Sequence, residues 1–241
     1  MSGRAEHEIY HGELLAGKDT EIIWGWGTPA GRVRATRRAK LIERGAKLGP
    51  NVYVLEIGCG TGLFTEMFAQ TGAQIVAVDI SPNLLKKAYE RNLPKDTARF
   101  MEKRFEDCYV DGPFDAVVGS SILHHLELEK ALQKIHELLK PGGVICFAEP
   151  NMLNPQVFAE RKFRKLFPYV SPDETAFVRW RFKSTLQKSG FTNIETTPFD
   201  WLHPSVPRSL IGLVSLMGRT LESIPFLREF SGSLYIRAIR T

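Results

Sequence analysis

The segment 54–62, VLEIGCGTG, restricts the fold of this chain more than any other. An apolar, β-branched run ends in three alternating glycines, and an amphipathic segment, 63–70, follows at once, so the pattern predicts a strand, a tight turn and a helix. Glycine is needed at Gly58, Gly60 and Gly62 because a Cβ would obstruct the turn and because a ligand must approach the main chain closely. The exposed start of the helix favours an electronegative ligand group such as a carboxylate. The segment therefore predicts a nucleotide-type binding turn.

A second apolar run, 74–79, ends in an acidic residue, Asp79. In doubly wound folds an acid at the end of the second strand accepts hydrogen bonds from the two hydroxyls of a ribose. More than one class of nucleotide cofactor fits that geometry. The dinucleotide fingerprint, G-x-G-x-x-G, requires its third glycine at position 63, where Leu63 stands, so the spacing departs from the dinucleotide pattern.

The pattern E-x-G-x-G-x-G at 56–62 resembles the first motif of the class I methyltransferases that use S-adenosylmethionine (SAM). The resemblance continues through Asp79, through FDAVVGSSILHHL at 114–126 and through LLKPGG at 138–143. These motifs cover about residues 50–150 in order and are jointly specific. The resemblance implies a SAM cofactor and an α/β fold: a doubly wound, mostly parallel, Rossmann-like sheet of seven strands with an antiparallel last strand.

Alternating apolar and polar segments predict the order of the elements from residue 51 onwards. Two further helices are expected outside that alternation, one from Thr28-Pro29 to about Gly45 and one from Ser171-Pro172 to about Gly190. The expected strands are 52–57, 74–79, 98–102, 114–120, 143–149, 192–198 and 233–239, and the other expected helices are 61–71, 82–91 and 126–139. The predicted domains are an N-terminal helical segment, 1–50, that covers the active site, and a SAM-binding domain, 51–241, with lid insertions at about 150–170 and 199–232.

The resemblance also assigns cofactor contacts. Asp79 is expected to hold the ribose hydroxyls, with Ile80 against the adenine face and Glu56 near the ammonium group of SAM. At the adenine edge, Arg104-Phe105 stands where relatives have an acidic residue followed by a small one. Either Phe105 donates its amide while Glu106 or Asp107 takes the acidic role, or the register differs. The main chain of Gly58, Cys59, Gly60 and Gly62 is expected to face the methionine part of SAM, and Ser120 is expected to line the pocket.

Two histidines, His124 and His125, follow the fourth predicted strand, where an acceptor would meet the methyl group. A histidine near its intrinsic pKa is a suitable general base for an oxygen nucleophile, so either residue is a candidate catalytic base; a structural role is equally open. Related quinone methyltransferases place two acids and a histidine here to bind a metal. Ser121 and His124 occupy the acid positions in this chain, so no metal is predicted.

Charge is distributed unevenly over the 241 residues, which carry a net charge of +5. Residues 1–50 hold 9 basic and 6 acidic side chains, residues 51–150 hold 10 and 14, and residues 151–241 hold 13 and 7. Basic flanks suit an anionic partner, although an ordinary solvated surface explains them equally well.

The chain has three cysteines, and an odd number fits a reducing cytoplasm. Neither an export signal at 1–11 nor a membrane-length apolar run is seen, so a cytoplasmic location is expected.

The leading functional hypothesis is a SAM-dependent methyltransferase that acts on a small-molecule or lipid acceptor. An RNA or protein methyltransferase that uses the basic flanks, and a non-catalytic SAM-binding or dinucleotide-binding protein, remain alternatives. Nucleic acid is not favoured as a partner, because the N-P-P-Y tetrad of DNA amino-methyltransferases is absent after the fourth strand and no separate RNA-binding module is visible. Trp24 and Trp26 either roof the active site or only pack against the domain.

The insertion 199–232 contains apolar residues at helical spacing with arginines between them. Such a helix packs on its own core or on a second subunit, which would make the protein an oligomer, or else it forms a surface that admits an apolar substrate or rests on an anionic membrane. The residues concerned are Leu210, Leu213, Val214, Met217, Leu221 and Ile224, with Arg208, Arg219 and Arg228.

Overall fold

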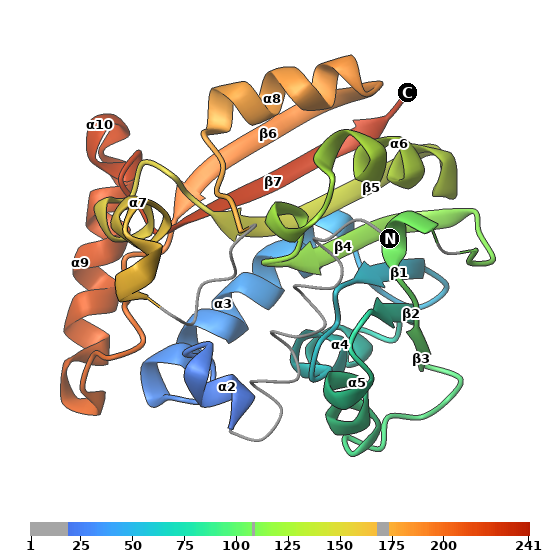
Figure 1. Ribbon diagram of the computed structural model, residues 1–241, viewed down its shortest axis with the longest axis horizontal. Coiled ribbons are helices and arrows are strands. Elements are labelled where there is room, and N and C mark those ends of the chain that lie inside the picture. The colour runs from blue at the N-terminus through green and yellow to red at the C-terminus, as the bar shows by residue number, and fades with distance from the viewer. Residues whose placement is uncertain (1–18, 108, 168–173) are drawn as a thin grey trace.

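A seven-stranded sheet with the order β3-β2-β1-β4-β5-β7-β6 forms the centre of the computed structural model (Figure 1). Strand β7 runs antiparallel to both of its neighbours, and the β1–β2, β1–β4, β2–β3 and β4–β5 pairs are parallel. The predicted fold class is therefore confirmed. The strands are β1 (Tyr53–Ile57), β2 (Gln74–Asp79), β3 (Ala98–Glu102), β4 (Phe114–Ser120), β5 (Leu139–Pro150), β6 (Phe191–Phe199) and β7 (Ser233–Arg240).

The structure describes residues 19–107, 109–167 and 174–241. Three sequence predictions lie wholly or partly outside these residues: the polar N-terminus, the end of the first lid insertion, and the helix start at Ser171-Pro172. Cys108 lies outside them as well.

Helices cover both faces of the sheet (Figure 1). Alternate residues of β1 enter two separate cores, Val54 on one face and Leu55 and Ile57 on the other, as the two-residue period of a strand requires. Both faces are therefore buried, which is why β1 and β2 are apolar along almost their whole length. The Val54 side packs on α3 (Pro29–Ala46), α4 (Leu63–Ala69) and α5 (Pro82–Tyr89), and the Leu55 side on α6 (Leu128–Leu138) and α8 (Arg179–Lys188).

The predicted starts of α3 and α5 are present. The hydroxyl of Thr28 accepts a hydrogen bond from the Gly31 amide, and that of Ser81 accepts one from the Leu84 amide. In each helix a proline follows the capping residue, where its missing N–H would have had no partner.

Helix α8 begins at Arg179, so the predicted start at Ser171-Pro172 is wrong for the described residues 174–178. Phe177 instead forms a β-bridge with Asn151, and Val178 has an extended backbone. The Phe177 amide donates to the Pro150 carbonyl over 3.1 Å, and the Met152 amide donates to the Phe177 carbonyl over 3.0 Å. The carboxyl end of β5 therefore holds this segment extended and brings it over the site.

The remaining helical segments gather around the carboxyl ends of the strands. Two ion pairs join helix α3 to the insertion 199–232. Arg34 pairs with Asp200 over 2.8 Å, and Arg37 pairs with Glu222. No helix in the described part of the chain is long and apolar enough to cross a membrane. The segments are α2 (Thr20–Ile23), η1 (Phe105–Asp107), η2 (Leu123–His125), α7 (Pro155–Lys162), η3 (Arg164–Leu166), η4 (Arg208–Leu210), α9 (Ile211–Ser223) and α10 (Pro225–Arg228).

Candidate functional site

The glycine turn after β1 has the backbone that its sequence predicts. Gly58, Gly60 and Gly62 have φ angles of +66°, +52° and +73°, which favour glycine. A Cβ at Gly58 would lie 2.4 Å from the side chain of Ile122. The amides of Gly58 and Cys59 both donate to the carbonyl of Val78, at 2.8 and 3.1 Å, so the turn is anchored to β2.

Asp79 lies at the end of β2 and closes the other side of the turn. Its Oδ2 accepts a hydrogen bond from the Gly60 amide at 2.8 Å, and its Oδ1 accepts one from the Ser81 amide at 2.9 Å. Burial raises the pKa of Asp79, and these backbone hydrogen bonds partly offset that effect. Each carboxylate oxygen keeps a further lone pair, so Asp79 can position the turn and still accept hydrogen bonds from a ligand.

A cavity of about 670 Å³ opens where β1, β2, β4 and β5 end, and Ile57, Asp79, Ser120 and Pro150 line it. This is the edge at which open α/β sheets bind ligands, and the volume is in the range of small-molecule sites. All of the predicted site residues line the cavity except Glu56 and Gly62. The predicted residues in the lining are Gly58, Cys59, Gly60, Asp79, Ile80, Phe105, Glu106, Ser120, His124 and His125.

Glu56 is buried behind the turn. Burial raises the pKa of Glu56 to about 8, despite the nearby Thr65 hydroxyl, so the carboxyl is mostly protonated at neutral pH. Cys59 contributes to the cavity lining but is also buried, and burial raises the pKa of its thiol well above the usual value. A protonated, buried thiol is a packing group rather than a nucleophile.

At the predicted adenine edge, Glu106 lines the cavity and Asp107 does not. Arg104 lies between them, 2.8 Å from the Asp107 carboxylate and 3.7 Å from that of Glu106. Glu106 and Asp107 were the two candidate acids for the adenine edge, and only Glu106 is placed to contact a ligand in the cavity.

The N-terminal segment forms a wall of the cavity. Trp24 and Trp26 both line it, and a Cβ at Gly60 would lie 3.4 Å from the Trp24 ring. Glu21 holds α2 in place, because it accepts a hydrogen bond from the Thr61 hydroxyl at 2.9 Å and pairs with Arg91. Trp24 therefore lies directly over the glycine turn.

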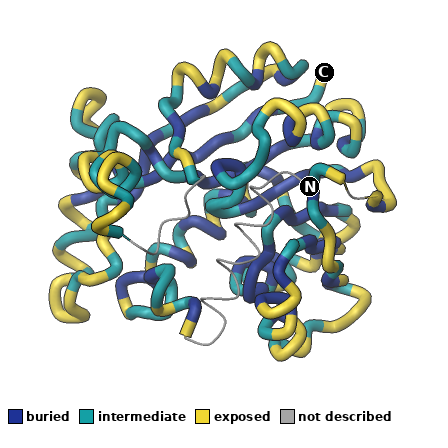
Figure 2. The backbone as a smooth tube through the Cα atoms, viewed as in Figure 1, coloured by how far each residue is buried: buried dark blue, intermediate teal, exposed yellow. Residues whose placement is uncertain are grey.

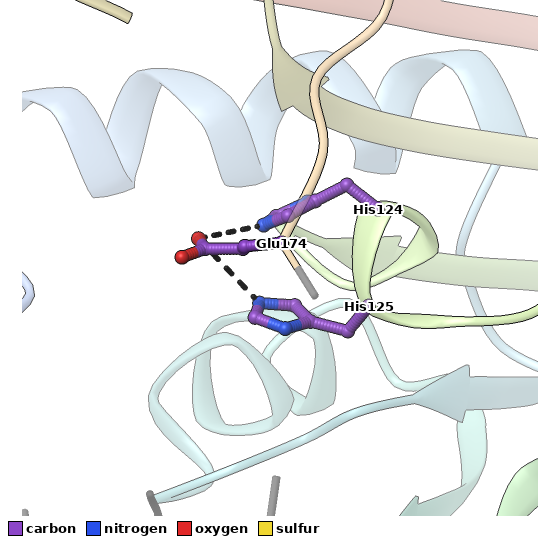
Figure 3. Close-up of side chains that lie close together, drawn as sticks. All are labelled: His124, His125 and Glu174. Carbon is purple, nitrogen blue, oxygen red and sulfur yellow. Dashed lines mark hydrogen bonds and ion pairs between the residues drawn. The ribbon is translucent and has the colours of Figure 1, made fainter. Parts of the chain in front are cut away.

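Two carboxylates enclose the histidine pair. His124 Nδ1 lies 2.6 Å from Glu149 Oε2, and His124 Nε2 lies 3.1 Å from Glu174 Oε1. Glu174 Oε1 is also 3.8 Å from His125 Nε2, so Glu174 contacts both imidazoles (Figure 3). Glu149 additionally accepts hydrogen bonds from the amides of Ile122 and Leu123, which orients η2 and with it both rings.

Electrostatics make this group an ion cluster. Burial alone would lower the pKa of His124, but hydrogen bonds and charges from Glu149 and Glu174 outweigh it and raise that pKa. Burial would raise the pKa values of both acids, yet His124 and its neighbours lower that of Glu149 and lower that of Glu174 to about 2. Glu149 and Glu174 therefore favour the protonated form of His124, which lies between the two carboxylates.

The ligand atoms of His124, His125 and Glu174 all lie within 4.8 Å of one another, a grouping that could hold a metal ion. The contacts already present satisfy the same atoms: Glu174 Oε1 accepts from Arg161 Nη2 at 3.0 Å, and both nitrogens of His124 face carboxylates. Because hydrogen bonds already occupy the ligand atoms of His124 and Glu174, the absence of a metal stays the prediction for this site.

Arg38 is a buried cation in the cavity wall and was not among the predicted site residues. Its guanidinium donates only to neutral groups, including the hydroxyls of Ser121 at 2.8 Å and Ser233 at 2.5 Å, and no carboxylate of the described residues lies within 4.0 Å of it. Burial lowers the pKa of Arg38 to about 10, which leaves it charged at neutral pH. Buried charges are normally paired, so an anionic ligand group fits here.

Glu149 and Glu174 were also missed as site residues. Glu149 ends a buried strand, and an acid inside an apolar run was the available signal. Glu174 had no such signal, because the extended segment 174–178 brings it to the histidines from 50 residues away in sequence.

The chain is similar to known methyltransferases in sequence. The family model described as "Methyltransferase domain" matches residues 55–147. The ubiquinone biosynthesis O-methyltransferase of Xanthomonas campestris pv. campestris (strain B100) is 35% identical over 114 residues, which cover 46% of this chain and 47% of that protein. The chain thus spans about half the length of that relative. The uncharacterized methyltransferase sll0829 of Synechocystis sp. (strain PCC 6803) is 32% identical over 151 residues, which cover 60% of this chain and 69% of that protein.

The fold matches at lower identity. The N-methyltransferase NodS from Bradyrhizobium japonicum WM9, solved in complex with S-adenosyl-L-homocysteine (SAH), superposes with a TM-score of 0.65 and 18% identity over 96% of this chain and 97% of NodS. The glycine turn, the acid that closes it and the sheet order agree with the sequence matches, and the chain belongs to the class I SAM-dependent methyltransferases.

Proposed function

We propose that this protein transfers a methyl group from SAM to a small-molecule acceptor. One observation carries the proposal: the glycine turn, Asp79 and the histidine pair all open into a single cavity. Methyl transfer needs the donor and the nucleophile to be held in line at close range, and a shared cavity satisfies that requirement.

The residues present fit SAM. Asp79 would accept hydrogen bonds from the ribose, the turn would present its main chain to the methionine part, and Ile80 and Glu106 would face the adenine. Arg38 offers an unpaired positive charge for the carboxylate of SAM. When bound, SAM supplies a methyl group already activated by its sulfonium, so the protein's remaining task is to position the acceptor and remove its proton.

The geometry favours His125 over His124 as the base for an oxygen acceptor. Both nitrogens of His124 face carboxylates, which favour its protonated form, so His124 is poorly placed to take a proton from an acceptor. His125 lines the cavity near Asp79 and Glu174, between the cofactor end and the acceptor end. In this assignment His125 removes the acceptor's hydroxyl proton as the new carbon–oxygen bond forms, Glu174 stabilises the resulting imidazolium, and His124 positions Glu174.

The relatives support an acceptor of small size but differ in its chemistry. One is named as an O-methyltransferase of ubiquinone biosynthesis and a structural neighbour as an N-methyltransferase. The base assignment favours oxygen for this chain. An RNA or protein acceptor has less support, because a cavity of about 670 Å³ has the size of a small-molecule site.

The test is a screen of cell extracts for small molecules that gain label from methyl-labelled SAM, followed by kinetics on the product found. Turnover should fall by about 10² to 10⁴ in His125→Gln, the range of a lost general base. The matched variant His124→Gln should retain a base and lose less turnover. Label that appears only in RNA or protein, or equal turnover of His125→Gln and wild type, would contradict the proposal.

A further inference from the structure

Helix α9 turns an apolar face outwards. Of its 13 residues only Gly218 is buried, against the side chain of Trp201. On the opposite face Leu213, Leu216 and Met217 are 57%, 61% and 56% exposed. Surface helices normally direct their apolar face towards the core, so this helix has the reverse arrangement. The hypothesis that it packs on the chain's own core is wrong for these side chains.

The same end of the molecule carries further exposed apolar side chains. Figure 1 places α7, α9 and α10 together there, and Figure 2 shows much of their surface as exposed. Exposed apolar clusters of this kind mark interaction surfaces. We call this set the α7–α10 surface: Phe158, Phe163, Leu166, Leu210, Leu213, Leu216, Met217, Ile224 and Phe226.

The exposed charges on these elements are cationic. Lys162, Lys165, Arg208 and Arg219 are exposed. The acids of the same described segments are largely buried and paired: Glu160 lies 3.6 Å from Arg161, and Glu222 pairs with Arg37. Glu229, just after α10, lies 2.7 Å from Arg179. The α7–α10 surface therefore exposes apolar and positively charged side chains, while its acidic side chains are largely buried in ion pairs.

We propose that the α7–α10 surface binds an anionic lipid bilayer. Apolar side chains would enter the boundary between headgroups and acyl chains while the cations meet anionic headgroups, a combination typical of interfacial helices. A protein partner is less well matched, because the centres of protein interfaces are depleted in lysine.

The position of this surface deepens the proposed function and rests on it. Val157 and Gln156 of α7 and His203, just before η4, line the cavity. The segments that carry the α7–α10 surface therefore also line the cavity in which the acceptor would bind. A bilayer bound there would deliver an apolar acceptor, so the substrate class is a lipid-dissolved molecule with a methylatable hydroxyl.

The test is cosedimentation of the full chain with vesicles of phosphatidylcholine, alone or mixed with phosphatidylglycerol. The protein should sediment with the mixed vesicles at low salt and much less at high salt. Each removed cation should weaken binding about fivefold, so Arg208→Gln/Arg219→Gln should weaken it more than tenfold. Leu213→Ser/Met217→Ser should weaken it by at least as much, since each side chain loses apolar burial.

Matched controls are Lys86→Gln/Lys95→Gln, which removes equal charge from another exposed region, and Tyr109→Ser, which removes an exposed aromatic. Both should sediment like wild type. Absence of sedimentation at low salt, or equal loss in the controls, would overturn the proposal. So would a dimer that Leu213→Ser/Met217→Ser converts to monomer, because a second copy would then cover the surface. SAM binding, measured by calorimetry on the same variants, tests the proposed function separately.

Discussion

The imidazole Nδ1 of His124 lies 2.6 Å from Oε2 of Glu149, and both side chains are buried. Glu149 also accepts the amides of Ile122 and Leu123, so one carboxylate fixes the start of η2 and the ring orientation together. The pair links the end of β5 to the segment that carries both histidines.

Breaking this pair should be costly for stability. Removal of one partner of a buried ion pair leaves the other charge uncompensated, so Glu149→Gln should lower the free energy of unfolding by about 3 to 5 kcal/mol. Urea unfolding monitored by circular dichroism measures this. Glu195→Gln, on exposed β6 surface, is the control and should change stability by less than about 0.5 kcal/mol. Equal effects of the two substitutions would show that the pair does not stabilise the fold.

The cluster also predicts how stability varies with pH. The raised pKa of His124 contributes stability that is present below the unfolded value, about 6.5, and is lost as pH rises through the folded value. The lowered pKa values of Glu149 and Glu174 contribute stability above about 4.3 that is lost as pH falls through the folded values. The stability difference between wild type and His124→Gln should therefore be largest between about pH 4.5 and 6.5 and shrink at alkaline pH. A difference that stays constant from pH 5 to about pH 9 would contradict the ion-cluster assignment.

Asp79→Asn should weaken SAM binding more than folding. The amide oxygen can keep one of the two backbone hydrogen bonds that Asp79 accepts, from Gly60 or from Ser81. The ribose loses a charged acceptor, which is worth about 1.5 to 3 kcal/mol, or roughly 10- to 150-fold in Kd. Calorimetric titration with SAH and thermal unfolding measure the two effects. Glu102→Gln at the end of β3 is the control, because Glu102 is exposed and lies outside the cavity lining. Unchanged affinity in folded Asp79→Asn would refute the ribose assignment.

Arg38→Gln should separate the two ends of the cofactor. If Arg38 meets the carboxylate of SAM, the variant should bind SAH about 10- to 150-fold more weakly. Methylthioadenosine, which lacks the amino-acid part, should bind wild type and variant alike. Equal loss for both ligands would indicate a general packing defect, and no loss for either would place the anion elsewhere.

The sequence predicted the turns and helix starts whose conformation depends on a few neighbouring residues. The glycines at 58, 60 and 62 form the expected turn, and the caps at Thr28 and Ser81 start the expected helices. The family resemblance implied a mostly parallel seven-stranded sheet with an antiparallel last strand, and the structure confirms it. These features depend on backbone conformation and on a short period of apolar residues, both of which are visible in one sequence window.

Contacts between distant segments were not predictable in this way. Glu174 reaches His124 because Phe177 pairs with Asn151 just after β5, a tertiary contact that overrides the helix expected there. Arg38 is one of several arginines on α3, and the sequence does not show which of them is buried. Its burial depends on how α3 packs against the sheet. The apolar spacing of α9 predicted a helix correctly, but periodicity alone does not say whether the apolar face meets the core or the solvent.

Calorimetric titration of the purified protein with SAM, SAH and NAD tests the central claim most directly. SAM and SAH should each bind at one site per chain, with a negative heat-capacity change from apolar burial in the cavity, and NAD should give no binding heat. Binding of NAD with no binding of SAM or SAH would contradict the account.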